Sequence, residues 1–316
     1  MKNLLLESSE LFSFKHHESL TNVRLISFYC AAVFMLISLL VLVSNGLNLG
    51  LDFTGGYLTE FSTKQSITQS NMEALISPYL NDSFQLSSAE NGRHWSVQQF
   101  TNTTAIGVTE MPWLAEFSQQ SGLTITPLDA VYIGSQVGEE LINQGGLALL
   151  TAIMVILVYL AFRFEWRLAV GSVVALFHDV IIVLGLFAWF EISFDLTILA
   201  SLLAIIGYSL NDSIIVGDKV REIMKENKDK NIDTVINLAI KSTIVRTLIT
   251  SGTTLATIVA IWIFAGESLA GFAIALFSGI LVGTFSSIAI SATVPKLLGL
   301  SADYYNKREE EVCQLP

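Results

Sequence analysis

The sequence predicts a helical membrane protein with six transmembrane helices and one α+β domain, of the ferredoxin-like type, between the first and second helices. Hydrophobic residues make up 52% of the 316 residues and charged residues only 14%, whereas soluble domains average roughly 25% charged residues. Apolar stretches long enough to cross a membrane recur along the chain. The one long segment that separates the first two stretches has the mixed composition of a small soluble domain.

The apolar stretches define the predicted spans. An α-helix needs about 20 apolar residues to cross about 30 Å of hydrocarbon, and each stretch is close to that length. The first stretch is too long for the core of a typical signal peptide and follows a polar start, so we interpret it as an uncleaved anchor. The six predicted spans are residues 25–46, 146–162, 168–190, 196–217, 244–264 and 269–293.

The positions of the basic residues predict the orientation in the membrane. Of 17 Lys and Arg residues, only Lys64 and Arg93 lie in the long segment between the first two spans. The others lie before the first span, in the 163–167 turn, within 219–246, or at and after the end of the last span. By the positive-inside rule these regions are cytoplasmic, residues 47–144 lie on the far side, and both termini are cytoplasmic.

Charge and cysteine content exclude several classes of protein. The formal net charge of −11 argues against binding to nucleic acid, which calls for a basic patch or stripe. Cys30 lies inside the first span and Cys313 in the tail, so no disulfide framework is expected. No cofactor and no metal site are predicted, because the pair His16-His17 is a weak signal by itself.

The segment between the first two spans alternates strand-like and helix-like patterns in the order strand, helix, strand, strand, helix, strand, which suits a ferredoxin-like sandwich. With one histidine, His94, and no cysteine, it contains no catalytic constellation. A glycine turn at Gly55-Gly56 should lead into its first strand. The expected outer strands lie near 57–61 and 123–133, the two middle strands fall within strand-like stretches near 83–87, 94–101 and 104–109 whose division is open, and the expected helices lie near 68–80 and 111–121.

The domain organisation follows from these assignments. After Gly134 and Gly138 a helix should run directly into the second span and couple the outer domain mechanically to the membrane part. Asn231 to Lys241 has the pattern of an amphipathic helix on the membrane surface, or of a solvated connector. The predicted parts are a cytoplasmic segment 1–24, the span 25–46, the outer domain 47–144, a five-helix bundle 145–300 with a cytoplasmic loop 218–243, and a cytoplasmic tail 301–316.

Asp212, in the inner half of the fourth span, is the residue around which the candidate site is built. A carboxylate near the middle of a lipid-exposed helix costs roughly 2.5–3.5 kcal/mol on insertion scales, so Asp212 should face protein or water and have a partner. The candidate partner is Arg246, near the start of the fifth span. Burial and a nearby arginine act in opposite senses on the proton affinity of a carboxyl group, so the pair is a candidate for proton coupling.

Other polar residues inside the spans have two open interpretations, a relay or hydrated path and helix packing. His178-Asp179 is either a relay station or a hydrogen-bonded pair that fixes the third span. The threonines of the fifth span either line a hydrated path or satisfy carbonyls of their own helix. The candidate relay or packing residues are His178, Asp179, Ser209, Asn211, Thr250 and Thr254. A small residue at every fourth position of the sixth span, from Gly271 to Ser291, predicts close packing against another helix.

Several motifs, in order along nearly the whole chain, resemble the SecF family, the smaller subunits of the SecD/SecF accessory complex of the bacterial Sec translocon, within the resistance-nodulation-division superfamily. They are Asp52-Phe53-Thr54-Gly55-Gly56, Phe162-Arg163-Phe164-Glu165-Trp166-Arg167, His178-Asp179-Val180, Ile206-Gly207-Tyr208-Ser209-Leu210-Asn211-Asp212-Ser213, Arg246-Thr247-Leu248 and Gly283-Thr284-Phe285-Ser286-Ser287-Ile288. Gly217 and Lys219 depart from the family pattern, where a larger apolar residue and an arginine are usual.

The resemblance implies a complex in the bacterial inner membrane that uses the proton-motive force to help exported polypeptides complete their crossing. The outer domain would then be periplasmic and contact the emerging polypeptide. The implied partners are a SecD-like subunit, the SecYEG translocon and the translocating polypeptide. In such proteins an aspartate in the fourth span and an arginine in the fifth carry the proton coupling, and these roles map onto Asp212 and Arg246.

Three alternatives are open. A proton-coupled exporter of small molecules or lipids from the same superfamily would also need a partner or a dimer, since this chain is half of the usual repeat. An intramembrane aspartyl protease built on Asp179 and Asp212 is disfavoured, because helical rise places the two carboxyl groups about 8–10 Å apart along the membrane normal and a dyad needs them side by side. In a purely structural subunit, Asp212 and Arg246 would only lock the bundle.

Overall fold

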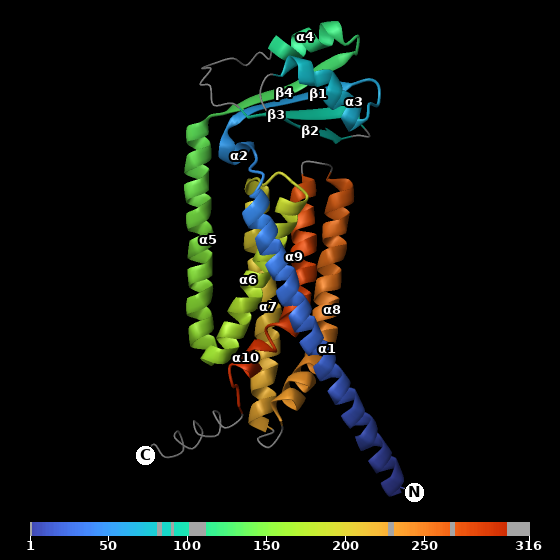
Figure 1. Cartoon of the computed structure of the whole chain (residues 1–316), viewed down its shortest axis with the longest axis vertical. Coiled ribbons are helices and arrows are strands. Elements are labelled where there is room, and N and C mark those ends of the chain that lie inside the picture. The colour runs from blue at the N-terminus through green and yellow to red at the C-terminus, as the bar shows by residue number, and fades with distance from the viewer. Residues whose placement is uncertain are drawn as a thin grey trace.

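The computed structural model describes residues 2–80, 84–89, 92–100, 112–226, 231–265 and 269–301. A long helical bundle carries a small domain of sheet and helices at one end (Figure 1). Within the described residues six helices are long and apolar enough to cross a membrane. The predicted fold class, six spans with one α+β domain between the first two, is therefore confirmed.

The first helix differs from its predicted bounds. A separate segment 1–24 was expected before the span, but α1 is one continuous helix, because the sequence from Lys2 to Asn45 contains no proline or glycine to interrupt it. The bundle consists of α1 (Lys2–Asn45), α5 (Ser135–Arg163), α6 (Trp166–Trp189), α7 (Leu196–Glu226), α8 (Ile232–Phe264), α9 (Ala270–Ala289) and the short α10 (Val294–Leu297).

Three helices form the core of the bundle. Half of the apolar window of each of α6, α7 and α9 is buried, against 6% for α1 and α5. The helix α7 packs against α6, α8 and α9, and α1 crosses over α6 and α9. The helix α5 stands at the edge of the bundle (Figure 1). The polar residues of α7 are therefore enclosed by neighbouring helices.

The predicted close packing of the sixth span is confirmed. A Cβ atom added at Gly279 would lie 2.4 Å from Ile205 Cδ1, and one added at Gly283 would lie 3.2 Å from Ser209 Cβ. Small residues on α9 thus let its backbone approach α7 closely.

The interpretation of residues 231–241 as a surface helix is wrong. These residues begin α8, which runs without a break from Ile232 to Phe264. The apolar side of this first part is buried against the last turns of α7, with Ile236 and Ala239 fully inaccessible. The amphipathic pattern therefore marks a face that packs on protein rather than on lipid.

A polar cluster that the sequence did not indicate ties α1 to this part of α8. Arg24 is 3% exposed, and its guanidinium donates to Asn237 Oδ1 at 3.0 Å and to Asp233 Oδ1. Lys296 of α10 donates to the same Asp233 carboxylate at 2.7 and 2.8 Å. Three helices that are far apart in the sequence are thereby joined at the end of the bundle opposite the domain.

The domain has the predicted ferredoxin-like arrangement. All described strand pairs are antiparallel in the order β2-β3-β1-β4, and α3 and α4 lie on one face of the sheet (Figure 1). Phe61, Met72, Trp95 and Phe117 are fully buried between the layers. The elements are β1 (Gly56–Thr63), α3 (Gln69–Ile76), the 3-10 helix η1 (Ser77–Tyr79), β2 (Phe84–Ala89), β3 (His94–Gln99), α4 (Pro112–Gln120) and β4 (Ile125–Ile133). The expected strand at 104–109 lies outside the described residues.

A short segment links α1 to the sheet. One helical turn, α2 (Leu51–Thr54), precedes two glycines with positive φ, Gly55 at 72° and Gly56 at 139°. The predicted glycine turn into the first strand is thus present.

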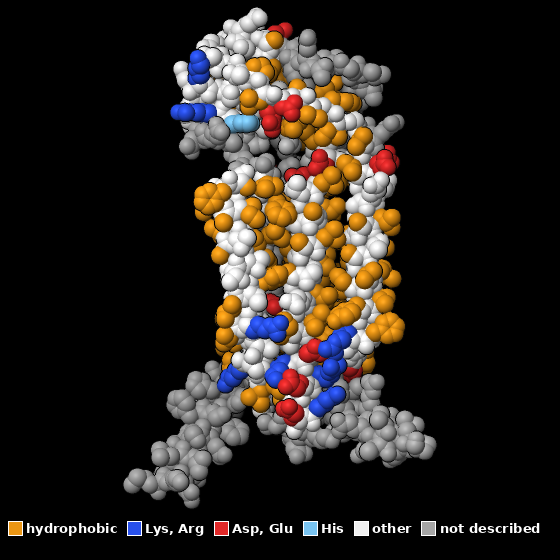
Figure 2. Space-filling model, turned by 180° about the vertical axis from the view of Figure 1, so that it is seen from behind, with side chains coloured by type: hydrophobic (Ala, Val, Ile, Leu, Met, Phe, Trp, Pro, Cys, Tyr) orange, Lys and Arg blue, Asp and Glu red, His pale blue; other side chains and the backbone are white. Residues whose placement is uncertain are grey.

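The surface is divided by side-chain type. On the face seen in Figure 2, apolar side chains cover the bundle, and the Lys and Arg side chains of the bundle are gathered at the end away from the domain. This distribution is the one that the positive-inside rule associates with the cytoplasmic side.

Candidate functional site

Asp212 lies on α7 within the core of the bundle. Its side chain is 1% exposed, and its Oδ2 atom has no hydrogen-bond partner among the described residues. A buried carboxylate oxygen without a partner is rare, because burial of a charge is unfavourable unless the charge is paired. The environment of Asp212 is therefore not that of a satisfied structural aspartate.

Arg246 lies on the neighbouring helix α8 and is exposed in the isolated chain. Both residues belong to the described part of the chain, and they do not form an ion pair there. The sequence analysis expected a direct contact. The structure brings the two residues to facing helices without closing that contact, and their coupling role remains a prediction.

Two buried hydroxyl groups next to this pair in the sequence also lack partners among the described residues. They are Ser213 Oγ, adjacent to Asp212 on α7, and Thr247 Oγ1, adjacent to Arg246 on α8. Both residues are 1% exposed. Buried polar atoms left unpaired on both helices distinguish this part of the α7–α8 interface from ordinary packing.

Asp179 is also a buried carboxylate, but unlike Asp212 it has hydrogen-bond partners for both of its oxygens. Its Oδ1 pairs with His178 Nδ1 at 2.9 Å, and its Oδ2 accepts hydrogen bonds from Ser286 Oγ, at 2.9 Å, and from Ser209 Oγ. These partners come from α6, α9 and α7. The predicted His178–Asp179 pair exists, and it extends to two serines that connect three helices.

This polar cluster lies next to the candidate coupling residue. Ser209 precedes Asp212 by three residues on α7, which is about one helical turn. Gly283 of α9 lies against this cluster, because a Cβ atom there would lie 3.2 Å from Ser209 Cβ, a tight contact, and 3.4 Å from Asp179 Oδ2. The geometry fits the packing interpretation of Asp179, and its role as a relay remains a prediction.

A second polar link was missed by the sequence analysis. Tyr208 Oη donates to Ser251 Oγ at 3.4 Å, and Ser251 Oγ is 2.7 Å from Thr284 Oγ1. It joins α7, α8 and α9. Ser251 stands four residues after Thr247, so a count along that face of the helix would have found it.

The buried polar side chains of α8 lie on a different face of the helix from the stripe predicted for the fifth span. Thr250 Oγ1 donates to the Arg246 carbonyl at 3.0 Å, and Thr254 Oγ1 to the Thr250 carbonyl at 2.9 Å. Both side chains are only half-buried, whereas Thr247 and Ser251 are buried. The relay role of Thr250 and Thr254 stays a prediction, as does that of Asn211, which is exposed in the isolated chain.

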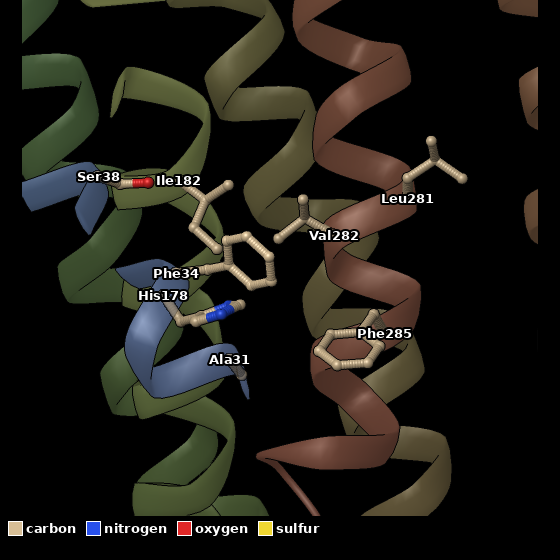
Figure 3. A pocket seen from close by; sticks show the side chains of 8 residues that line it. All are labelled: Ala31, Phe34, Ser38, His178, Ile182, Leu281, Val282 and Phe285. Carbon is tan, nitrogen blue, oxygen red and sulfur yellow. The ribbon is translucent and has the colours of Figure 1, made fainter. Parts of the chain in front are cut away.

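His178 forms one wall of a cavity of about 380 Å³ between α1, α6 and α9 (Figure 3). While Nδ1 pairs with Asp179, the buried Nε2 atom has no partner among the described residues. The other lining residues are Ala31, Phe34, Ser38, Ile182, Leu281, Val282 and Phe285. None of them belongs to α7 or α8, so the cavity lies apart from Asp212 and Arg246.

Neither metal chemistry nor an aspartyl dyad is indicated by the geometry. Within the described ranges no three His, Cys, Asp or Glu side chains are placed to hold a metal ion. The hydrogen-bond partners of the Asp179 carboxylate are His178, Ser209 and Ser286, and Asp212 is not among them.

Comparison with known proteins gives consistent matches. Residues 115–300 match the family model described as protein export membrane protein SecD/SecF, C-terminal, and residues 40–67 match the SecD/SecF GG motif. A protein translocase subunit SecF from Pseudomonas aeruginosa is 36% identical over 281 residues, 89% of this chain and 91% of that protein. The SecF of Escherichia coli O157:H7 is 35% identical over 291 residues, 90% of this chain and 89% of that protein.

A solved structure has the same fold. The crystal structure of SecDF from Thermus thermophilus, a translocon-associated membrane protein, matches with a TM-score of 0.78 and 30% sequence identity. The match covers 88% of this chain but only 38% of the SecDF chain. This chain is therefore similar to one part of a larger protein.

Proposed function

This chain belongs to the SecF family of protein translocase subunits and is a multi-pass membrane protein of the Sec export system, and from that premise we propose that Asp212 and Arg246 couple the proton-motive force to export. The relatives are named translocase subunits, which speaks for protein export rather than for export of small molecules or lipids. The observation that carries the proposal is the buried Asp212 carboxylate with an unpaired oxygen, on a helix that packs against the helix of Arg246.

The mechanism follows from two opposing effects. Burial disfavours the charged form of a carboxyl group and a nearby arginine favours it, so movement of Arg246 changes the proton affinity of Asp212. Protonation in turn removes the charge that Arg246 attracts. One proton moved through 100 mV is worth about 2.3 kcal/mol, which biases a two-state packing by about 50-fold. That bias is sufficient to drive an alternation between two arrangements of α7 and α8.

The partners are part of the proposal. A SecD-like subunit would supply what this chain lacks relative to SecDF, of which it spans 38%. The helix α8 supports this, because Arg246 is exposed in the isolated chain, and a charged residue within a span needs protein or water beside it rather than lipid. The complex would act with the SecYEG translocon on the translocating polypeptide. We place it in the bacterial inner membrane, with the basic end of the bundle (Figure 2) and both termini in the cytoplasm and the domain in the periplasm.

Asp212→Asn should abolish the gradient-dependent part of export and leave the ATP-driven part unchanged, because asparagine keeps the size of the side chain and does not titrate. The measurement is export of a secreted reporter into inverted membrane vesicles with ATP, with and without a proton gradient. Asp218→Asn is the matched control on the same helix, at a one-third exposed position paired with Arg163. It should retain both parts.

Two outcomes would count against the coupling role. If Asp212→Asn keeps gradient-dependent export, the proton site lies elsewhere. If Asp212→Asn and Arg246→Gln each prevent assembly and the exchange of the two residues restores it, the pair is structural.

A further inference from the structure

The segment that follows α1 is bonded to the loop that precedes α7. Gly50 N donates to the Phe194 carbonyl at 2.8 Å, and Phe194 N donates to the Asn48 carbonyl at 2.7 Å. Asn48 Nδ2 also donates to the Glu191 carbonyl at 2.9 Å. We name residues 48–53 together with 191–194 the joint. It is built from main-chain bonds between two segments that are far apart in the sequence.

Asp52 extends the joint into α7 itself. Its Oδ2 atom accepts a hydrogen bond from the backbone N–H of Leu196, the first residue of α7, at 3.0 Å. The first N–H groups of a helix have no partner within the helix, and a carboxylate is the favoured acceptor at this positive end. Asp195 caps the third residue of α7 from within the same segment, accepting from Ile198 N at 3.0 Å. Asp52 is thus a cap supplied by a distant part of the chain.

The other side of the joint meets α5 and the sheet. A Cβ atom added at Gly138 of α5 would lie 2.6 Å from the Phe53 carbonyl oxygen, so the two backbones are in close contact. Phe53 also stacks on Phe194, with ring centroids 5.8 Å apart. Two residues after α2, Gly56 begins β1. One short segment therefore touches α7, α5 and the first strand of the outer domain.

The helix that Asp52 caps is the helix that carries Asp212. Leu196 and Asp212 belong to one unbroken α7, about 24 Å apart at 1.5 Å per residue. A helix of this kind moves as a rigid element, so a shift or tilt at Asp212 displaces its N-terminus. Through the Asp52 carboxylate that displacement acts on the segment from which β1 emerges.

We propose that Asp52 is a positioning residue that fixes the N-terminus of α7 to the start of the outer domain, and that this joint transmits the movement of α7 to that domain. The proposal rests on the proposed coupling function of Asp212. What Asp52 contributes is a hydrogen-bond acceptor, and its negative charge is not required, since asparagine caps helices about as well as aspartate.

The test compares Asp52→Ala with Asp52→Asn in the full chain, in membranes with its partner subunit. Asp52→Ala should reduce gradient-dependent export severalfold and leave ATP-driven export unchanged, while Asp52→Asn should retain both. Hydrogen exchange of the first turn of α7 should rise about fivefold in the alanine variant, as expected for loss of a cap. The asparagine variant should exchange as wild type does.

Asp195→Ala is the matched control, because it also removes a cap from the first turn of α7 but leaves the bond between Asp52 and Leu196. It should raise exchange and keep gradient-dependent export. The proposal is overturned if Asp195→Ala lowers that export as much as Asp52→Ala, if asparagine at position 52 fails as alanine does, or if alanine there raises exchange without lowering export. Asp212→Asn, measured in parallel, shows separately whether the coupling function itself fails.

Gly138→Ala tests the α5 side of the joint. Its Cβ atom would press on the Phe53 carbonyl, a backbone atom that cannot yield without movement of the joint, so gradient-dependent export should fall severalfold. Gly146→Ala is the control on the same helix, since nothing lies within 4 Å of its Cβ position. Equal export by the two variants, in membranes that contain equal amounts of protein, would argue against transmission through this contact.

Discussion

Asp179→Ala should lower the free energy of unfolding of the bundle by about 3–5 kcal/mol, the range seen when one partner of a buried charged pair is removed. The variant would leave His178 Nδ1, Ser209 Oγ and Ser286 Oγ without their common acceptor. These donors lie on three helices and are at most 2% exposed, so water cannot replace the lost carboxylate without opening the bundle. Unfolding by titration with a denaturing detergent in mixed micelles would measure the difference.

Two further variants sharpen this prediction. Asp179→Asn keeps an oxygen that can accept hydrogen bonds from the serines, and His178 can change tautomer to accept one from the new amide. The loss in the free energy of unfolding should therefore be about half as large as in Asp179→Ala, or less. Asp212→Asn should leave stability unchanged or raise it, because it neutralises a buried group whose Oδ2 is unpaired. Equal destabilisation by Asp179→Ala and Asp212→Asn would contradict the distinction between the two carboxylates.

Asp179 is thus expected to contribute to the stability of the bundle, and Asp212 to its function. The oxygens of Asp179 are held by three helices, and a proton there would break bonds that the fold needs. Asp212 has an unpaired oxygen, so gain or loss of a proton there breaks no hydrogen bond of that oxygen and need not dismantle the bundle. An unsatisfied group of this kind lowers stability and is expected where function requires two states.

The features that the sequence predicts well are those set by local composition. The lengths of the apolar stretches define six membrane helices, and the order of alternating patterns in the outer segment defines its sheet and helices. The strong small-residue periodicity of α9 likewise predicts its contact with α7. Each of these signals is carried by many residues, so an error at one position does not alter the conclusion.

Features that depend on the meeting of distant single residues could not be predicted. The basic residue Arg24 was counted only for orientation, yet it is buried against Asn237 and Asp233. A periodicity fixes the faces of a helix but not which neighbour covers each one, so the burial of Thr247 and Ser251 of α8 was not predicted. Whether Asp212 and Arg246 form an ion pair depends on side-chain conformation, about which a sequence pattern carries no information.

Gly56→Ala should unfold or severely loosen the outer domain, with an expected loss of at least about 3 kcal/mol. A non-glycine residue in a sparsely populated backbone conformation costs about 1–3 kcal/mol, and Gly56 has φ of 139°. In addition, the new Cβ atom would lie 2.1 Å from the carbonyl oxygen of Gln99. Gln99 pairs with Tyr57 in the ladder between β1 and β3, so relief of the clash requires the two central strands to separate.

Protease digestion from the domain side of intact membranes would measure this loss in the full chain. Gly122→Ala provides the control, because Gly122 also has a positive φ, of 67°, but nothing lies within 4 Å of its Cβ position. The control should lose only about 1–2 kcal/mol of stability, the cost of the backbone strain, and it should remain largely resistant to digestion. If both variants are cleaved at the same rate, backbone strain alone explains the requirement for glycine, and the close approach of Gln99 to Gly56 does not limit the fold.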